Sequence, residues 1–367
     1  MRAAVGKAIV PTLVIAALIG VAILLTSDKE ANGNSTIVAK APKDLSEPAT
    51  GTLRVFAYGD TVTNTMMDPF REQNPDLNLE IATFNSNKAA AAKLSGGFDA
   101  DVVEVCTDEM EPLTKRGLLR PLDPKGVPGF DQLAFSGSDD IRNAAGNVLF
   151  VPGSSGPHGI IVNTDEVSEP IDSYAQLFED RFAGRVALEG SSLTALGVTG
   201  LALGFDDPFD MDSDELDQAK QYLIDHRDNF RSFAESDSDM VNLFKSGEVV
   251  IADGGRGTAN DMIADGLPVK WIAPKEGAMS WVCGFALTSE GENIPAAYRL
   301  MDYYSSPEAQ ALSAKAGFVA MNPKALALLP PELRADADPE TLKTAIPETQ
   351  PRLAELYDRA WQEVAVG

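Results

Sequence analysis

Histidine and cysteine are scarce in this chain of 367 residues, which contains two of each. The histidines are His158 and His226. Few residues are therefore present that could form a histidine-based metal site or a catalytic pair of the Ser-His or Cys-His kind. Two cysteines, Cys106 and Cys283, make neither a disulfide framework nor a zinc site of the usual spacing. We predict that they are buried thiols, and one long-range bridge is the alternative.

Positive charge is also scarce, because 30 lysine and arginine residues face 55 aspartate and glutamate residues and the net charge is -25. Nucleic-acid binding is excluded as a function class, since phosphate contacts need clustered basic residues. Adsorption on anionic lipid is disfavoured for the same reason. The acidic balance is typical of a solvated surface that keeps a protein soluble.

Motifs of common enzymes are missing from the sequence. The chain has no Gly-x-Ser-x-Gly, no phosphate-binding loop, no Gly-x-Gly-x-x-Gly after a strand and no histidine pair spaced as metal ligands. We therefore expect no enzyme activity, no cofactor and no metal. Hydrophobic residues make up 44% of the chain, so a large packed interior is available, and the length suits two lobes or two domains.

A long apolar run stands near the amino terminus. Arg2 and Lys7 precede residues 8–25, an arrangement that favours an outward orientation for the rest of the chain. A helix of this run would be about 27 Å long, close to the ~30 Å hydrocarbon core of a bilayer. No small-x-small cleavage site and no lipidation cysteine follow it. We predict an uncleaved transmembrane anchor at residues 1–27, in preference to a cleaved signal peptide, and a flexible linker at 28–51.

Strands and helices alternate beyond residue 51. Runs of apolar residues predict strands at 53–58, 77–81 and 101–105, and helical spacing predicts helices after each of them. This alternation indicates a mostly parallel sheet covered by helices, in which ligands bind beyond the carboxyl ends of the strands. Two such ends contribute the candidate ligand contacts Tyr58, Asp60, Thr61, Thr107 and Asp108.

A second α/β unit follows the glycine-rich segment 153–159, which is typical of a flexible crossing. Strands are predicted there at 160–163, 249–252 and 269–273. Two α/β halves joined in this way indicate two lobes around a cleft.

Several short segments stand in a characteristic order through residues 52–367. They include Asp101-Val102-Val103, Lys115-Arg116-Gly117-Leu118, Gly159-Ile160-Ile161-Val162-Asn163, Pro274-Lys275-Glu276-Gly277 and Ser306-Pro307-Glu308. This ordered set resembles the spermidine/putrescine-binding group of type II periplasmic binding proteins, which are extracytoplasmic solute-binding proteins of ABC importers. The resemblance implies two α/β lobes with a ligand cleft between them, which close by hinge bending and then dock on a permease.

The resemblance also implies where the lobes begin and end. Lobe 1 is expected at residues 52–157 plus about 281–320, and lobe 2 at 158–280 plus about 321–367. Crossings between the lobes are expected near 154–159, 276–281 and 317–322.

In polyamine-binding relatives, aromatic side chains stack on the methylene chain and carboxylates pair with the ammonium groups. Carried over position by position, the resemblance implies ligand contacts at Tyr58, Asp60, Trp281 and Phe318. The loop at 189–194 adds Glu189 and Ser191 as candidates, although relatives usually have more acidic residues there.

Two positions depart from the polyamine-binding pattern. Cys283 stands where relatives carry an acid, and Gly255 stands where they carry a stacking tryptophan. The next residue, Arg256, would repel a cation in the cleft and would bind a carboxylate or phosphate. Its structural alternative is an ion pair with Asp253 or Asp261.

The other candidates have structural alternatives as well. Helix capping would explain Asp60, Asp108 and Ser191 without any ligand. Trp281 would equally suit the core, and His158, beside the expected hinge, is expected to be structural.

The sequence therefore predicts the solute-binding component of an ABC importer, located outside the cytoplasm, anchored by its amino terminus and monomeric. Its predicted partners are a small-molecule ligand and an ABC permease, and the favoured solute is a polyamine such as spermidine or putrescine. An anionic or zwitterionic solute is the alternative. A membrane-tethered ligand sensor is a second alternative function.

Overall fold

A single mixed sheet runs through the part of the chain that the computed structural model describes, which is residues 38–84, 86–108 and 110–366. Within those residues it contains eleven strands in the order β2-β1-β3-β10-β5-β8-β6-β7, with β4 and β11 beside β10 and β9 beside β5. The strands are β1 (Gly51–Tyr58), β2 (Leu77–Phe84), β3 (Val102–Cys106), β4 (Leu119–Arg120), β5 (Phe150–Asn163), β6 (Val186–Glu189), β7 (Phe230–Ala234), β8 (Ile251–Gly255), β9 (Val269–Ile272), β10 (Met279–Thr288) and β11 (Ile346–Pro347).

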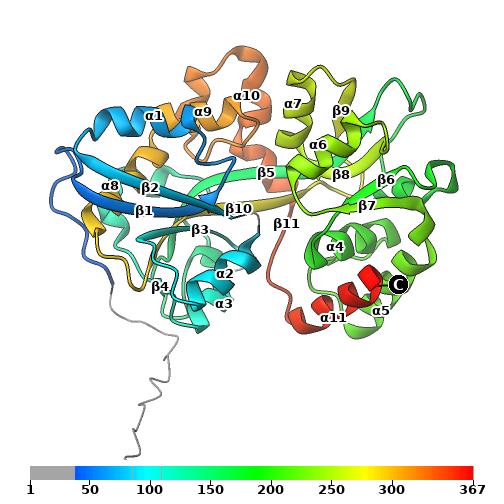
Figure 1. Cartoon of the computed structure of the whole chain (residues 1–367), viewed down its shortest axis with the longest axis horizontal. Coiled ribbons are helices and arrows are strands. Elements are labelled where there is room, and N and C mark those ends of the chain that lie inside the picture. The colour runs from blue at the N-terminus through cyan, green and yellow to red at the C-terminus, as the bar shows by residue number, and fades with distance from the viewer. Residues whose placement is uncertain (1–37, 85, 109, 367) are drawn as a thin grey trace, which may run out of the picture. The chain divides into compact units, whose positions relative to one another are not determined.

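The α-helices lie between these strands and at the carboxyl end of the chain (Figure 1). Their bounds are α1 (Asn64–Gln73), α2 (Asn87–Ser95), α3 (Met110–Lys115), α4 (Ser192–Leu203), α5 (Ser213–Asp225), α6 (Asp237–Lys245), α7 (Arg256–Ala264), α8 (Ile294–Ser305), α9 (Pro307–Lys315), α10 (Pro331–Ala337) and α11 (Ala354–Val366). Polar caps begin several of them; for example, the side chains of Thr63, Ser86 and Ser236 accept backbone N–H groups at the starts of α1, α2 and α6.

The first strands pair as the alternating pattern predicts, since β1 is parallel to both β2 and β3. The segment 153–159 differs from its prediction as a flexible crossing. It belongs to β5, a continuous strand of 14 residues that pairs with β10 up to His158, with β8 from His158 onward and with β9 from Ile160 onward. Pairing with β10 along most of this glycine-rich stretch satisfies backbone polar groups, so it forms regular strand.

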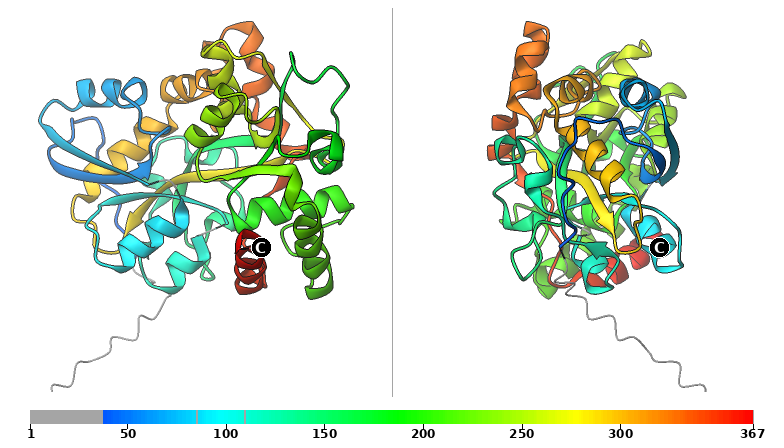
Figure 2. Two further views of the ribbon diagram at one scale, coloured as in Figure 1. Left: turned by 45° about the vertical axis from the view of Figure 1, so that its right-hand side comes forward. Right: turned by 90° about the vertical axis from the view of Figure 1, so that its left-hand side faces the viewer.

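Two large hydrophobic clusters form the core. The first cluster gathers buried side chains from β1, β3, α1, α8 and the start of β5, and the second gathers them from β6, α4, α5, α11 and the end of β5. A smaller cluster under α6 and α7 adjoins the second one along β8. Helix α11, drawn in red in Figures 1 and 2, packs against α4 and α5, which are drawn in green.

Strands β5 and β10 pass from the first cluster to the second. Phe150 and Phe285 lie in the first cluster, whereas Ile160 and Met279, on the same two strands, lie in the second. Figure 1 shows both strands running through the middle of the folded chain. We call the region where they pass between the clusters the junction.

The third crossing between the lobes is expected at 317–322. Val319 packs with Leu342 and with Phe135, and Ala320 packs under α9, so that segment stays with elements of the first side. The chain passes the junction at β11, which pairs with Met279 and Ser280 of β10, and it then enters the second cluster at Tyr357.

The predicted linker at 28–51 is wrong for its described part, because residues 38–50 pack on the first cluster. Ala39 is buried and forms a bridge with Leu122, and its carbonyl accepts the hydroxyl of Tyr298. Ala49 is also buried, and its backbone N–H donates to Asn74. The predicted anchor at residues 1–27 lies outside the described residues. Among the residues from 38 onward that are described, no helix is long and apolar enough to cross a membrane.

Candidate functional site

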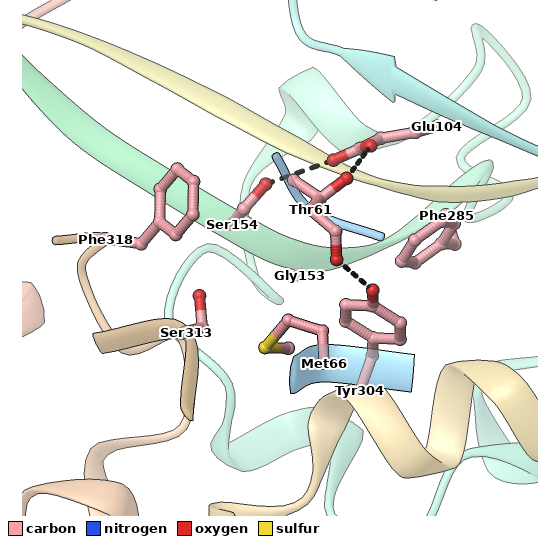
Figure 3. Close-up of a pocket in the computed structure, with 9 residues that line it drawn as sticks. All are labelled: Thr61, Met66, Glu104, Gly153, Ser154, Phe285, Tyr304, Ser313 and Phe318. Carbon is pink, nitrogen blue, oxygen red and sulfur yellow. Dashed lines mark hydrogen bonds between the residues drawn. The ribbon is translucent and has the colours of Figure 1, made fainter. Parts of the chain in front are cut away.

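Glu104 organises the turn that follows β1. It is 1% exposed, and its carboxyl group accepts hydrogen bonds from the Thr61 hydroxyl at 2.6 Å and from the Tyr58 backbone N–H at 3.1 Å. The hydroxyl of Ser154 on β5 lies 3.3 Å from its other oxygen (Figure 3). Burial raises the pKa of Glu104 to about 8, although these hydrogen bonds act in the opposite direction. The Thr61 hydroxyl is therefore engaged within the protein.

A small cavity lies beside Glu104 (Figure 3). Its volume is about 10 Å³, and its lining includes Ser154, Tyr304 and Phe318. Such a space holds one water molecule at most, so a solute would need the walls to separate. A larger hollow of about 490 Å³ lies over β7 and α6, and none of the predicted site residues lines it.

Asp60 stands on the turn after β1, where strand-end geometry places it. It does not cap α1, because Thr63 fills that role. Its side chain is open to water, but surrounding protein limits hydration of the charged form and raises its pKa to about 6, with Asp237 and Asp261 adding to the rise. Asp237 begins α6 and Asp261 lies on α7, so carboxylates of the second side act on Asp60, which follows β1 on the first side.

His158 forms a second group with two carboxylates at the ends of β6 and β8. Its Nε2 atom lies 3.0 Å from Asp253 Oδ2, and its Nδ1 atom lies 3.6 Å from Glu189 Oε2. The backbone N–H of Glu189 donates to the other oxygen of Asp253 at 2.8 Å. Burial raises the pKa of Glu189 to about 7, with His158 lowering it and Asp253 raising it. Glu189 was predicted from the sequence as a ligand contact, and the structure brings it to the junction.

Glu348 reaches the same group from the carboxyl-terminal segment that follows β11. It is 8% exposed, and its backbone N–H donates to Ser280 of β10 at 2.7 Å. Its carbonyl accepts the hydroxyl of Thr107 at 3.3 Å, so this hydroxyl too is used inside the protein. Burial raises the pKa of Glu348 to about 8 and that of Asp108 to about 6. We call Asp60, Asp108, Glu189, Asp253 and Glu348 the junction acids.

Aromatic side chains accompany these carboxylates. Trp281 on β10 and Phe318 make an edge-to-face contact, with ring centroids 5.8 Å apart. Tyr58 packs edge-on against Phe84, with centroids 4.5 Å apart. Trp281 and Tyr58 are half-buried.

The other two predicted contacts have structural roles in this arrangement. The Ser191 hydroxyl oxygen accepts the backbone N–H of Thr194 and caps α4, which is the alternative given for it above. Arg256 is 8% exposed and pairs with neither Asp253 nor Asp261, so that alternative is wrong. Its guanidinium donates to the backbone carbonyl of Asp336 and lies over the ring of Trp271, 5.8 Å from the centroid.

Cys106 and Cys283 are joined by a disulfide, so the prediction of two buried thiols is wrong. The two residues face each other in the antiparallel pairing of β3 with β10. Cys283, in the position where relatives carry an acid, is therefore covalently engaged and offers no charge to a ligand. Within the described residues, no group of three or more His, Cys, Asp or Glu side chains is arranged to hold a metal ion.

Three acids of this region were not among the contacts predicted from the sequence: Glu104, Asp237 and Glu348. Glu104 carried one usable signal, since it is the single charged residue inside the otherwise apolar strand β3. Asp237 and Glu348 carried none, because their placement depends on contacts across the junction.

Comparison with known proteins shows the family to which this chain belongs. Residues 65–341 match the family model described as bacterial extracellular solute-binding protein. The spermidine/putrescine-binding periplasmic protein 1 of Haemophilus influenzae is 25% identical over 334 residues, which cover 88% of both chains. A solved structure of the spermidine/putrescine ABC transporter substrate-binding protein PotD from Streptococcus pneumoniae superposes with a TM-score of 0.71 at 21% identity, covering 86% of this chain and 98% of that one. The binding protein MotA of Agrobacterium tumefaciens in complex with glucopine also gives 0.71, at 19% identity and with coverage of 86% and 99%.

The fold is thus that of the type II periplasmic binding proteins, two α/β lobes that share hinge strands, as predicted. The chain belongs to the family of bacterial extracellular solute-binding proteins. Its folded part is extracytoplasmic, and its role is to bind a small molecule and to work with an ABC permease. The family and these relatives are binding proteins rather than enzymes. The residue boundaries of the two lobes stay predictions.

Proposed function

We propose that this protein is the solute-binding component of an ABC importer and that its solute is a polyamine such as spermidine or putrescine. The observation that carries the proposal is the convergence of Asp60, Asp108, Glu189 and Glu348 on the junction from four separate segments, each with a raised pKa. Raised pKa values mean that the protein does not stabilise these charges fully. Ammonium groups of a bound ligand would do so.

The aromatic side chains support the same solute. Trp281 and Phe318 meet beside β5, and Tyr58 stands next to Asp60 at the end of β1. A polyamine presents methylene groups between its charges, and half-buried aromatic rings suit such a chain. The names of the aligned relatives, which bind spermidine and putrescine, agree with this choice.

The environment of Arg256 weakens the alternative of an anionic solute. That alternative needs a guanidinium free to meet a carboxylate, whereas Arg256 donates to Asp336 and packs on Trp271. The glucopine complex of MotA has the same fold, so the fold by itself does not choose between the solutes.

In the proposed transport cycle, the lobes open at β5, β10 and β11, admit the polyamine and close on it, and the closed form docks on the permease. We take residues 1–27 as an amino-terminal anchor, which would raise the local concentration of the protein near its permease. We take the protein to act as a monomer.

Isothermal titration of the full-length chain with spermidine and putrescine tests the proposal, with glutamate and inorganic phosphate as competing solute classes. Spermidine at 100 times its Kd should stabilise the fold by about 2.7 kcal/mol in parallel thermal unfolding. Asp60→Asn should weaken binding, whereas Asp131→Asn, an equal loss of charge at an exposed residue of the first side, should not. Binding of glutamate or phosphate with no response to either polyamine would contradict the proposal.

A further inference from the structure

His158 lies among three of the junction acids, Asp253, Glu189 and Glu348. It is 4% exposed, in the middle of β5, and it pairs with Gly255 of β8 and with Met279 of β10. The hydroxyl of Tyr174, on η4 (Tyr174–Phe178), donates to its backbone carbonyl at 3.0 Å. Strands on both sides and a hydrogen bond from a third element therefore hold this residue in one place.

Both nitrogens of the imidazole ring face carboxylates, Nε2 toward Asp253 at 3.0 Å and Nδ1 toward Glu189 at 3.6 Å. A neutral imidazole has one N–H donor and one lone pair, and the lone pair would then point at a carboxylate. The doubly protonated ring fits this geometry. Burial by itself would lower the pKa of His158, but Asp253, Glu189 and Glu348 together raise it to about 9.

Three elements beside His158 each contribute an acid. Asp253 comes from β8, Glu189 from the end of β6 and Glu348 from the segment after β11, while Asp108, in the turn after β3, and Asp237 of α6 act on Glu189. Within the part of the chain that the structure describes, the ion pairs of Glu189, Asp253 and Glu348 involve no lysine or arginine. His158 is thus the cation that this acidic group has from the protein itself.

Glu189 is the partly exposed member of this ion-paired group. Its side chain is 46% exposed while its Oε2 atom faces His158, so one carboxylate meets both the buried ring and solvent. Asp253 holds the backbone from which the Glu189 side chain extends, because one of its oxygens accepts the Glu189 backbone N–H at 2.8 Å. Its other oxygen contacts the imidazole of His158.

We propose that His158 is a positioning residue that orients Glu189 for the ligand and favours the ionised form of this carboxyl group, and so sets the pH below which polyamine affinity is lost. The inference rests on the proposed function. Without the imidazolium, burial and the neighbouring carboxylates would shift Glu189 and Glu348 further toward their protonated forms, and a protonated carboxyl group cannot pair with an ammonium group.

The test is isothermal titration of the full-length chain with putrescine and with spermidine between pH 5.5 and pH 8.5. In His158→Gln, the pH at which half of the affinity is lost should rise by roughly one unit or more, the size of effect that a nearby opposite charge has on a carboxyl group. The difference in affinity between variant and wild type should be smaller at pH 8.5 than at pH 6.5. His158→Lys, which restores a positive charge, should return the midpoint toward that of the wild type. The matched control is His226→Gln at the only other histidine, which caps the carboxyl end of α5.

Two outcomes would overturn the inference. One is a profile of His158→Gln with an unchanged midpoint, and the other is an equal loss of affinity at every pH, which a purely structural role would cause. If the variant does not fold, the NMR titration of histidine side chains in the ligand-free wild type decides: a His158 ring still charged at pH 8 supports the inference, and a ring neutral by pH 7 overturns it. If the wild type binds neither polyamine, the proposed function fails, and the same NMR titration still decides the charge of His158.

Discussion

Lys88 on α2 and Asp358 on α11 form an ion pair with 2.8 Å between Nζ and Oδ2, although 270 residues separate them in sequence. Helix α2 contributes Ala90 and Ala91 to the first hydrophobic cluster, and α11 contributes Tyr357 to the second. The Ser192 hydroxyl, at the start of α4, also donates to Asp358 at 3.0 Å. The pair therefore bridges the two sides of the junction, and opening of the lobes would separate its partners.

We expect Lys88→Ala to weaken solute binding because it removes a contact of the closed form. Both side chains are largely exposed, at 72% and 44%, so the pair contributes about 0.2–1 kcal/mol, and the Kd should rise by roughly 1.5-fold to 5-fold. The effect should shrink at high salt, where exposed charges are screened. Titration at low and high ionic strength measures both effects.

The control for this prediction is Lys343→Ala. Lys343 makes an ion pair of similar exposure with Glu340, but both partners lie within η8 (Pro339–Thr344) and do not join the two sides. An equal loss of affinity in both variants would show that the net charge, rather than the bridge, is responsible.

The stability of the ligand-free protein should fall as the pH rises from 5 to 9. Asp60, Asp108, Glu189 and Glu348 have folded pKa values of about 6, 6, 7 and 8, above the ordinary value near 4. A carboxyl group of this kind favours the folded state below its unfolded pKa, and that contribution is lost as the pH rises through the folded pKa. His158 has a pKa raised to about 9 and also adds stability to the folded state. That stability is fully present below the ordinary pKa of histidine and is lost as the pH rises through about 9. Chemical unfolding across this range measures the slope.

Saturating spermidine should reverse that trend, since ammonium groups bind ionised carboxylates, and the stabilisation should be larger at pH 8 than at pH 5.5. Glu348→Gln removes one of the titrating groups and should flatten the slope between about pH 5 and pH 8, the range between its ordinary pKa and its raised pKa. Asp131→Asn, at an exposed acid outside the junction acids, should leave the slope unchanged. A stability that rises with pH in the ligand-free wild type would contradict the assignment of buried acids to the junction.

The parts of the site that were predictable from the sequence are those with a local pattern. Asp60 and Asp108 follow strands that alternate with helices, so their place at the strand ends could be predicted. Glu348 has no such pattern, because β11 pairs with β10 only in the folded chain. The glycine-rich segment of β5 resembles a loop in sequence and is strand because β10 pairs along it and β8 pairs with its last two residues.

The pairing of the cysteines could not be predicted for a similar reason. Cys106 and Cys283 are 177 residues apart, and they meet only because β10 lies beside β3 in the opposite direction. Arg256 illustrates the same limit, since its partner Asp336 lies on α10, 80 positions further along the chain. Local spacing suggested Asp253 or Asp261 as the ion-pair partner of Arg256, and Arg256 pairs with neither.

Removal of the disulfide should destabilise the protein. The bridge closes a long loop, and loss of such a constraint on the unfolded chain costs about 2–5 kcal/mol in proteins of this kind. We expect the double variant Cys106→Ser, Cys283→Ser to unfold at lower urea concentration than the wild type. The reductant dithiothreitol should shift the wild type toward the double variant and should not affect the variant itself. An identical transition for the wild type with and without reductant would contradict a bridged pair.

Arg256→Ala separates the polyamine proposal from the anionic alternative. Because the guanidinium is buried against Trp271 and donates to the carbonyl of Asp336, we expect its loss to lower the free energy of unfolding by about 1–3 kcal/mol. Affinity for spermidine should stay within about threefold of the wild type, because the side chain is engaged by α10 and not by the ligand. Arg352→Ala, which removes an exposed guanidinium paired with Asp210, is the matched control and should cost much less stability. A tenfold gain in spermidine affinity, or loss of binding to a carboxylate that the wild type does bind, would instead place the Arg256 charge in the ligand site.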